Sequence, residues 1–293
     1  MNRITSGMAT QAQARRLQEG LQRLSQLQDQ ASSQRAITKP SDDPAAASRA
    51  MAVRGEQTAT SQYARNITDG ISWLSTVDST LGNATNIMQR VRDLTVQGAN
   101  SGALNQSQRS AIADELDSLK TDLMTQANTQ YLGRPIFAGS SDTGSAFAAD
   151  YSYSGSTDAT VERRIDASTT VRVDADGAAA FGTGSTSTFA LIDSISADLR
   201  AGTDIGGRVD EVDQAITSLT TTRATAGLGY TSLQRAQSFT ASAATTLEST
   251  RAGLEDVDLA DVIVQLQLQQ TSYQAALQVT SKALQPSLMS FLS

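Results

Sequence analysis

The sequence predicts a mainly α-helical protein: a long antiparallel helical or coiled-coil bundle built from both chain ends, with a small β-rich domain inserted in the middle. An apolar 4–3 repeat runs from Ile205 to Leu254 and is apolar at 11 of its 15 positions. A second apolar stripe runs from Val262 to Phe291. Such repeats are typical of helices that pack along a shared seam. Between residues 136 and 188 the helical periodicity gives way to Gly, Ser, Thr and Asp, which predicts the insert.

The N-terminal arm begins with a predicted helix over about residues 3–35. Its apolar residues recur on or near one face: Ile4, Met8, Leu17, Leu21, Leu24 and Leu27. Pro40 ends this helix, and Asp43 and Pro44 suit the cap and the first turn of the next one. That second helix is predicted to extend to about Gln97, because glycine and asparagine residues follow it.

A third helix is predicted over about residues 105–128. Within the insert, the alternating residues at 151–154 and 169–174 predict short β-strands. Helical periodicity returns over 189–200, and the run at 255–258 breaks the long C-terminal helix into two.

Of the four seam positions that are not apolar, three carry long polar side chains: Arg223, Gln237 and Arg251. Polar seam residues cost stability and set register. We expect them either to fix one alignment of the bundle or to meet polar groups of a neighbouring subunit, and the sequence does not separate the two.

The sequence predicts three structural parts. The terminal helices, at 1–35 and 258–293, carry apolar stripes that need a partner, so we expect them to be disordered in the monomer. A helical body domain covers 43–135 and 189–254. The small β-rich inserted domain occupies 136–188.

Composition excludes several classes of function. The chain has no His and no Cys, which excludes Ser-His-Asp and Cys-His nucleophile systems and the common zinc and haem sites. The formal net charge is −7, and the sequence has no basic footprint of the kind that nucleic-acid-binding proteins carry. No apolar stretch is long enough for a membrane span, and the N-terminal residues lack the apolar core of a secretory signal peptide.

Two acidic pairs are the remaining candidates for acid–base chemistry or cation binding: Asp42–Asp43 and Glu255–Asp256. Both stand where a helix begins or changes phase, and acidic residues favour helix N-termini. We therefore expect no enzymatic activity, no cofactor and no metal site.

Three segments resemble the flagellin superfamily. Residues 31–50, ASSQRAITKPSDDPAAASRA, resemble the segment that joins the first two flagellin helices. Residues 66–100 resemble the second flagellin helix, including its QRVR-[ED]-L-x-VQ core. Residues 248–292 resemble the C-terminal segment, in which an I-E-D-x-D-like step precedes a long Gln- and Ala-rich helix. The three segments cover both arms in the family's order.

Within that superfamily the chain is most similar to the flagellin-like hook-associated proteins of the hook–filament junction. Residues 131–140, YLGRPIFAGS, are similar to their phrase G-x-Y-L-F-A-G-T, from which Pro135–Ile136 departs. Flagellins usually read F-N-G-x-x-L-L there. Residues 151–155 and 171–182 resemble the small β domain of the junction proteins, and the ending at 288–292 departs from that of flagellins. A short flagellin that forms the filament itself is the alternative.

The resemblance implies a structural role and a set of partners. The terminal helices would form the inner-tube domain of an axial structure, in which the protein assembles with itself as a ring. The implied partners are a hook-side hook-associated protein, flagellin and a cytoplasmic export chaperone at the C-terminal helix. The resemblance also implies type III export without a cleaved peptide, with the export signal in Met1–Gly20, to the extracellular flagellum.

The candidate assembly interface is spread over whole helices rather than gathered in a pocket. It comprises the apolar stripes of the two ends and one stretch of the second helix: Ile4, Met8, Leu17, Leu21, Leu24, Arg90, Arg92, Leu94, Leu266, Tyr273, Leu284, Leu288 and Phe291. Taken singly, each of these residues is more simply a helix-packing position. A remote alternative for the chain is a coiled-coil surface scaffold or adhesin that displays the insert.

Overall fold

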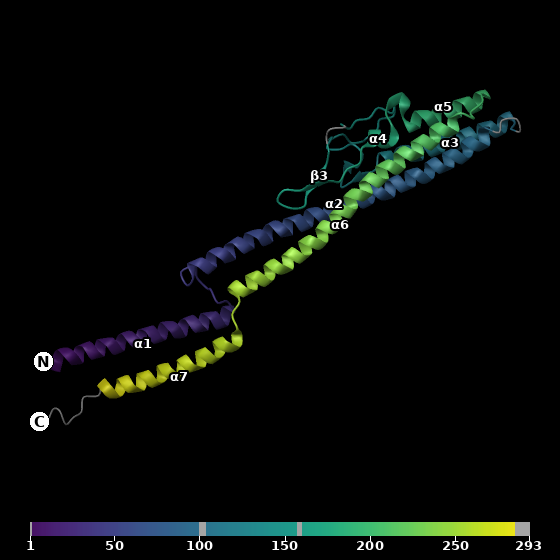
Figure 1. The fold of residues 1–293 in the computed structure, drawn as a ribbon. Helices are drawn as coiled ribbons and strands as arrows, with labels where there is room; N and C mark the ends of the chain where they lie inside the picture. The colour runs from purple at the N-terminus through teal and green to yellow at the C-terminus, as the bar shows by residue number, and fades with distance from the viewer. Residues whose placement is uncertain (1, 100–103, 157–159, 285–293) are drawn as a thin grey trace. The chain divides into compact units, whose positions relative to one another are not determined.

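The computed structural model describes residues 2–99, 104–156 and 160–284. Backbone contacts divide the chain into two compact units (Figure 1): unit 1, Met1–Ala59 with Ala244–Ser293, and unit 2, Thr60–Ala243. Both arms of the chain contribute to each unit, because the long helices α2 (Pro44–Ala99) and α6 (Arg208–Glu255) have residues in both.

Unit 1 contains an antiparallel pair of helices, α1 (Asn2–Ser33) and α7 (Leu259–Leu284), which lie side by side in Figure 1. Asp43 caps α2 as predicted, since its Oδ1 accepts hydrogen bonds from the N–H groups of Ala45 and Ala46 at 3.0 and 2.9 Å. Helix α6 ends at Glu255 and α7 begins after Asp258, so the predicted break at 255–258 is confirmed.

In unit 2 the helices begin and end at residues suited to those positions. Helix α3 (Gln106–Ala127) starts with a capping box between Asn105 and Gln108. Ser187 caps α5 (Thr188–Ala201). Gly202, with φ of 74°, ends α5 in the left-handed conformation that glycine adopts without strain. The predicted helices at 105–128 and 189–200 are therefore confirmed to within a residue or two.

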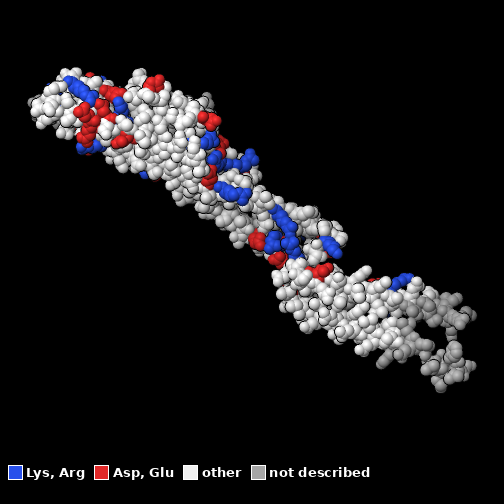
Figure 2. All heavy atoms as spheres, turned by 180° about the vertical axis from the view of Figure 1, so that it is seen from behind, with Lys and Arg blue, Asp and Glu red and all other residues white. Residues whose placement is uncertain are grey.

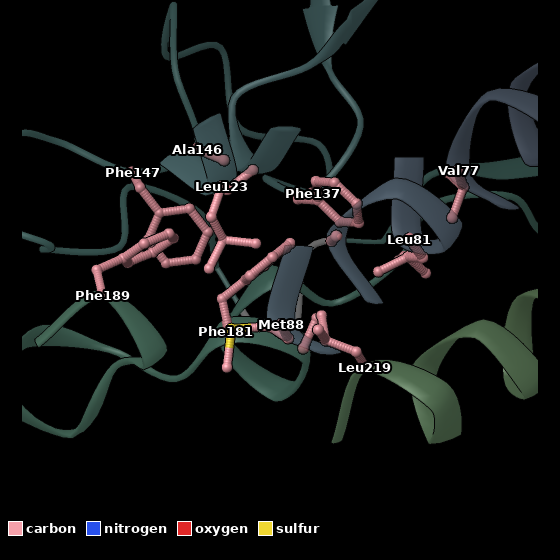
Figure 3. Close-up of a cluster of buried hydrophobic side chains, with 14 of the residues drawn as sticks. Val77, Leu81, Met88, Leu123, Phe137, Ala146, Phe147, Phe181, Phe189 and Leu219 are labelled. Carbon is pink, nitrogen blue, oxygen red and sulfur yellow. The ribbon is translucent and has the colours of Figure 1, made fainter. Parts of the chain in front are cut away.

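The core of unit 2 joins the long helices to the insert (Figure 3). The figure labels buried side chains from α2, α3, α6, α5 and the insert: Val77, Leu81, Met88, Leu123, Leu219, Phe189, Phe137, Ala146, Phe147 and Phe181. The ring centroids of Phe147 and Phe181 lie 5.4 and 5.8 Å from that of Phe189. Large aromatic side chains dominate core energetics, so the insert is held to the helices by the same core that holds the helices together.

The strand predicted at 169–174 is confirmed in shortened form. Strand β4 (Thr170–Arg172) pairs antiparallel with β3 (Glu162–Arg164), with Arg163 opposite Val171. A second two-stranded sheet, β1 (Gln130–Tyr131) with β2 (Arg134–Pro135), precedes the insert and was not predicted.

The strand predicted at 151–154 is wrong. Tyr153 makes a single bridge to Phe147, and Tyr151 has a positive φ of 65°, which no regular strand contains. Separate hydrogen bonds place the two tyrosines. Tyr151 Oη donates to Asp193 Oδ2 at 2.5 Å, and Tyr153 Oη donates to the Phe137 carbonyl at 2.7 Å. The insert also contains two short helical pieces that the sequence did not predict, α4 (Gly177–Phe181) and the 3₁₀ turn η2 (Gly184–Thr186).

Between residues 205 and 240, only every second position of the predicted seam along α6 is fully buried. Its buried members recur at every seventh residue: Ile205, Val212, Leu219, Ala226, Leu233 and Thr240. The polar residue Arg223 is exposed, and its Nε and Nη2 bond to the Asp78 carboxylate of α2 at 2.7 and 3.0 Å. Arg223 therefore makes a polar contact within the subunit, and which of the two expected uses the polar seam residues have stays a prediction.

The predicted fold class is confirmed: the protein is mainly helical, with long helices from both ends and small antiparallel sheets in the middle. The division into terminal, body and inserted domains stays a prediction, as does disorder of the terminal helices in the monomer.

Candidate assembly interface

The seam between α1 and α7 is narrow. Leu27 and Val262 are its buried apolar side chains, and the large half-buried ones among the described residues are Leu17, Leu24, Leu266 and Tyr273. A Cβ built on Gly20 would lie 3.3 Å from Tyr273 Cδ2, and Gln269 Nε2 donates to the Gly20 carbonyl at 3.1 Å. Gly20 thus lets a tyrosine ring and an amide reach the backbone of α1.

The same two helices expose apolar side chains to solvent. On α1 and α7 these are Met8, Leu21, Leu259, Ile263, Val264, Leu268, Leu277 and Val279. Met8 and Leu268 are the most exposed, at 66% and 67%. A scattered apolar residue is ordinary on a protein surface, but a set of this size on one helix pair indicates a surface that a partner covers.

Charged residues are sparse on α7, whereas α1 carries six: Arg3, Arg15, Arg16, Glu19, Arg23 and Asp29. On the face drawn in Figure 2, Lys, Arg, Asp and Glu gather over unit 2 and over the segments that link the helices, and few lie over α1 and α7. Within α7, only Asp261 and Lys282 are charged in sequence. A weakly charged surface with apolar side chains loses little on desolvation, so α7 is the helix of the pair that is better suited to burial in an assembly.

The segment that follows α1 and the segment between α6 and α7 are hydrogen-bonded to each other. The Ala36 N–H donates to the Glu255 carbonyl at 2.7 Å, and the Val257 N–H donates to the Gln34 carbonyl at 3.3 Å. The segment after α1 and the segment between α6 and α7 therefore form a short antiparallel bridge, which also satisfies carbonyls left free at helix ends.

A buried carboxylate lies beside this bridge. The Glu255 side chain is 5% exposed and accepts hydrogen bonds from Arg54 Nη2 at 2.7 Å and Arg251 Nη1 at 3.3 Å. The hydrogen bond from Arg54 lowers the pKa of Glu255 most, and the charge of Arg54 and the contacts with Arg251 lower it further. Together they hold this pKa below its usual value although burial raises it. We call the bridge together with Glu255, Arg54 and Arg251 the clasp.

The predicted interface residues of α2 make contacts inside unit 2. Arg90 pairs with Glu115 of α3 at 2.7 Å, and Arg92 pairs with Asp213 of α6 at 2.5 Å. Leu94 is 2% exposed and belongs to the core. The structure thus does not bring these three together with the α1–α7 pair, and their role toward a neighbouring subunit stays a prediction.

Of the remaining predicted residues, some lie on α1 or α7 and others lie outside the described residues. Met8, Leu17, Leu21 and Leu24 lie on α1, the first and third with exposed side chains. Ile4 and Leu284 lie in α1 and α7, but the description does not extend to their side chains. Leu288 and Phe291 lie outside the described residues.

Sequence reasoning missed Gly20 and the clasp. The contact between Arg54 and Glu255 joins residues 201 apart, so no local pattern announces it. The available signal was the position of Glu255 itself, an acidic residue at the last turn of a long helix, where acidic side chains are disfavoured unless they have a cationic partner.

The described part of the chain offers little for other chemistry. It contains no cluster of three or more acidic side chains placed to hold a metal ion. Across the same residues, every helix is too short or too polar to cross a lipid bilayer.

The fold and this surface define a class: a mainly helical structural protein whose N- and C-terminal segments pair with each other. Comparison with known sequences gives the family. The bacterial flagellin N-terminal helical region matches residues 4–142, and the bacterial flagellin C-terminal helical region matches residues 209–292. Together they match more than half of the chain, which therefore belongs to the bacterial flagellin family.

The matches to individual relatives cover a smaller part of the chain than the two family regions do. Flagellar hook-associated protein 3 of Salmonella typhimurium is 33% identical over 157 residues, which are 53% of this chain and 49% of that protein. Polar flagellin F of Vibrio parahaemolyticus is 31% identical over 130 residues, 44% of this chain and 34% of that protein. The matches thus span half or less of the length of these relatives.

A solved structure shares the fold. The crystal structure of Xanthomonas campestris FlgL superposes with a TM-score of 0.60 at 19% identity, covering 70% of this chain and 99% of that one.

Proposed function

We propose that the protein is a structural component of the bacterial flagellum, an adapter at the junction between hook and filament that assembles with itself through its terminal helices. The observation that carries the proposal is the pairing of flagellin-type N- and C-terminal segments into one helix pair that exposes apolar side chains. A chain built for such burial needs no catalytic residue, and we propose no enzymatic activity.

The segment at 131–140 supports the junction over the filament. It is the segment similar to the phrase of the hook-associated proteins, and two residues that match the phrase, Phe137 and Ala138, are completely buried in the core of unit 2. Tyr131 packs against Trp73 of α2 with ring centroids 5.3 Å apart. The likeness therefore includes residues that hold the insert to the core of unit 2.

The proposal includes a route and partners. The protein leaves the cytoplasm through the flagellar type III apparatus without a cleaved peptide, with Met1–Gly20 as the export signal and the C-terminal helix as the contact for an export chaperone. Outside the cell it meets a hook-side hook-associated protein on one side and flagellin on the other. The exposed apolar side chains of α1 and α7 supply the contacts between copies.

Deleting the gene tests the proposal. We expect cells with hooks but without filaments, and monomeric flagellin accumulating in the medium, because the filament then lacks its attachment site. Re-expression of the full chain restores filaments, and electron microscopy with immunoblotting of the medium gives both measurements.

The same experiment distinguishes the alternatives. A short flagellin is favoured by the match to polar flagellin F, and its deletion would shorten or remove filaments without release of other flagellins. A surface scaffold or adhesin would leave hooks, filaments and swimming unchanged. Either outcome would contradict the junction role.

A further inference from the structure

The tip of the β1–β2 hairpin holds an apolar side chain in an unfavourable backbone conformation. Tyr131 is paired with Arg134, so Leu132 and Gly133 form a two-residue loop. Both have a positive φ, 50° and 79°, as in a type I′ turn. Such turns favour Asn-Gly, because a bulky side chain is strained at positive φ. Leucine is therefore a poor residue for this turn.

Packing within the chain does not offset that strain. The Leu132 side chain is 82% exposed, more than any other large apolar side chain among the described residues. The base of the hairpin is anchored, because Tyr131 packs against Trp73 and Pro135 is buried. A strained and exposed leucine on an anchored base stabilises nothing in the free chain. Such an outlier points to a role outside the folding of the chain.

Unit 2 also contains a groove suited to an apolar side chain. The groove has a volume of about 350 Å³ and lies between β4, the start of α4 and α6. Its apolar lining comes from Val171 and from small residues, among them Ala175, Ala226 and Gly229. Small residues along these elements leave room for a side chain that enters from outside.

The charges of the hairpin and of the groove are complementary. Arg134, two residues after Leu132, is exposed, and its Nη2 makes a long hydrogen bond of 3.5 Å to the Ser140 carbonyl. The charged residues that line the groove are one arginine and two aspartates, which leaves a net charge of −1. Arg172 pairs with Asp174 at 2.9 Å, so the remaining carboxylate is that of Asp176. An apolar tip beside a cation thus matches an apolar groove beside an anion.

The hairpin and the groove are separate patches of one chain. Asp69 accepts hydrogen bonds from Tyr131 Oη at 3.5 Å and from Arg163 Nε of β3 at 2.6 Å, so the hairpin lies beside β3. The groove runs along β4 and α6, and none of its lining residues belongs to the hairpin. A contact between the two patches therefore joins different surfaces of two copies, which produces rings or helical arrays.

We infer that the β1–β2 tip of one copy docks into the β4–α6 groove of a second copy, with Leu132 in the groove and Arg134 against Asp176. This contact rests on the self-assembly proposed above and extends it, because it lies in unit 2 and not on α1 and α7.

Cysteine cross-linking of the purified full chain tests the contact. The chain has no cysteine, so Leu132→Cys and Thr225→Cys introduce one thiol each. Thr225 is exposed, lines the groove, and its hydroxyl donates to the Thr221 carbonyl of its own helix. The two variants are mixed and oxidised, with a tag on one of them so that mixed dimers are separated by size. Thr220→Cys is the matched control, an exposed threonine of the same helix outside the groove.

We expect a mixed disulfide dimer from Leu132→Cys with Thr225→Cys and about tenfold less from Leu132→Cys with Thr220→Cys, because only the first pair is brought together by docking. No mixed dimer, or equal yields from the two mixtures, would overturn the proposal.

Leu132→Asn separates this contact from a role in folding. Asparagine suits the turn, so the melting temperature of the free chain should stay unchanged or rise. Self-association, measured by sedimentation over a range of concentrations, should weaken by at least about tenfold because a buried leucine is lost. Phe239→Asn removes another exposed apolar side chain of unit 2 and should leave association unchanged. A parent chain that stays monomeric, a lower melting temperature in Leu132→Asn or unchanged association in that variant would overturn the proposal.

The outcome can be told apart from that of the gene deletion. Cross-linking of the purified chain involves no hook and no filament. A mixed dimer together with normal filaments in the deletion strain would contradict the junction role and leave this contact standing. Missing filaments without a mixed dimer would support the junction role and overturn the contact.

Discussion

Unit 1 and unit 2 use the same kind of long helix but differ in what they bury. Unit 2 has a continuous core in which α2, α3, α5, α6 and the insert all take part. Among the described residues of unit 1, the buried apolar side chains are Leu27, Ala50 and Val262. Since burial of apolar surface is the main favourable term in folding, unit 2 gains more stability from its own contacts than unit 1, and we expect unit 1 to depend on neighbours.

The largest expected effect is in the core of unit 2. Phe181 is completely buried, and its ring lies against Phe137, Phe147 and Phe189. Phe181→Ala should lower the free energy of unfolding by about 3–5 kcal/mol, because it removes the ring and leaves a cavity. Phe239→Ala is the control, since that ring is 74% exposed, and should stay within about 0.5 kcal/mol of the parent. Denaturant unfolding of both variants measures the difference, and equal losses would remove the basis for separating core from surface.

A glycine substitution should act in opposite directions in the two units. A Cβ on Gly177 would meet the Phe137 carbonyl oxygen at 2.7 Å, so Gly177→Ala forces α4 to move and should cost about 1–3 kcal/mol. Gly253, in the unit 1 part of α6, has open space around it. Gly253→Ala should be neutral or stabilise its helix by up to about 1 kcal/mol. Thermal melting of the two variants checks the signs, and destabilisation by Gly253→Ala would mean that unit 1 is packed more tightly than described.

The two units should lose stability at opposite ends of the pH scale. In unit 2, burial and then the charge of Asp176 raise the pKa of Tyr153 to about 12. Folding therefore favours the neutral phenol, and its contribution is complete below pH 10 and is lost as pH rises towards 12. In unit 1, the lowered pKa of Glu255 gives a contribution that is present above pH 4.5 and is lost as pH falls through the folded pKa.

Two single variants separate the alkaline and the acid parts of the curve of stability against pH. Tyr153→Phe should flatten the alkaline limb of the stability curve of unit 2, and Glu255→Gln should flatten the acid dependence of protease protection in the segments beside the clasp. Parallel curves for parent and variant in either limb would show that other groups carry that pH dependence.

The smallest expected effect on melting is in the seam of unit 1. Leu266 is half-buried against α1, so Leu266→Ala should change the free energy of unfolding of the free chain by less than about 1 kcal/mol. The same variant should impair attachment of filaments in cells, because we propose that assembly buries this side chain in every copy. Melting that falls as far as in Phe181→Ala would place Leu266 in the folding core instead.

The sequence was informative where local chemistry decides the structure. The Asp43 cap, the break after Glu255 and the apolar repeat of α6 are local signals, and the structure has each of them. The insert was harder, because Tyr151 and Tyr153 alternate like strand residues but are placed by long-range hydrogen bonds to Asp193 and to the Phe137 carbonyl. Short segments without a partner strand cannot be recognised from alternation alone.

The candidate interface divides in the same way. The apolar stripes of α1 and α7 follow from helical periodicity, and the structure places Leu17, Leu24, Leu266 and Tyr273 in one seam. Which stripe members face inward could not be predicted, because that depends on how the two arms pair, and contacts between the arms, such as that of Arg54 with Glu255, join residues 201 apart.

Native-state hydrogen exchange of the full free chain tests the contrast between the units most directly. Because the structure pairs α1 and α7, the prediction of terminal disorder takes a measurable form: their amides should exchange by local opening at low free energy, while the buried stretches of α2 and α6 exchange only on global unfolding. Assembly should then protect α1 and α7. Terminal helices as strongly protected in the free chain as the core of unit 2 would contradict the account, because unit 1 would then need no neighbours.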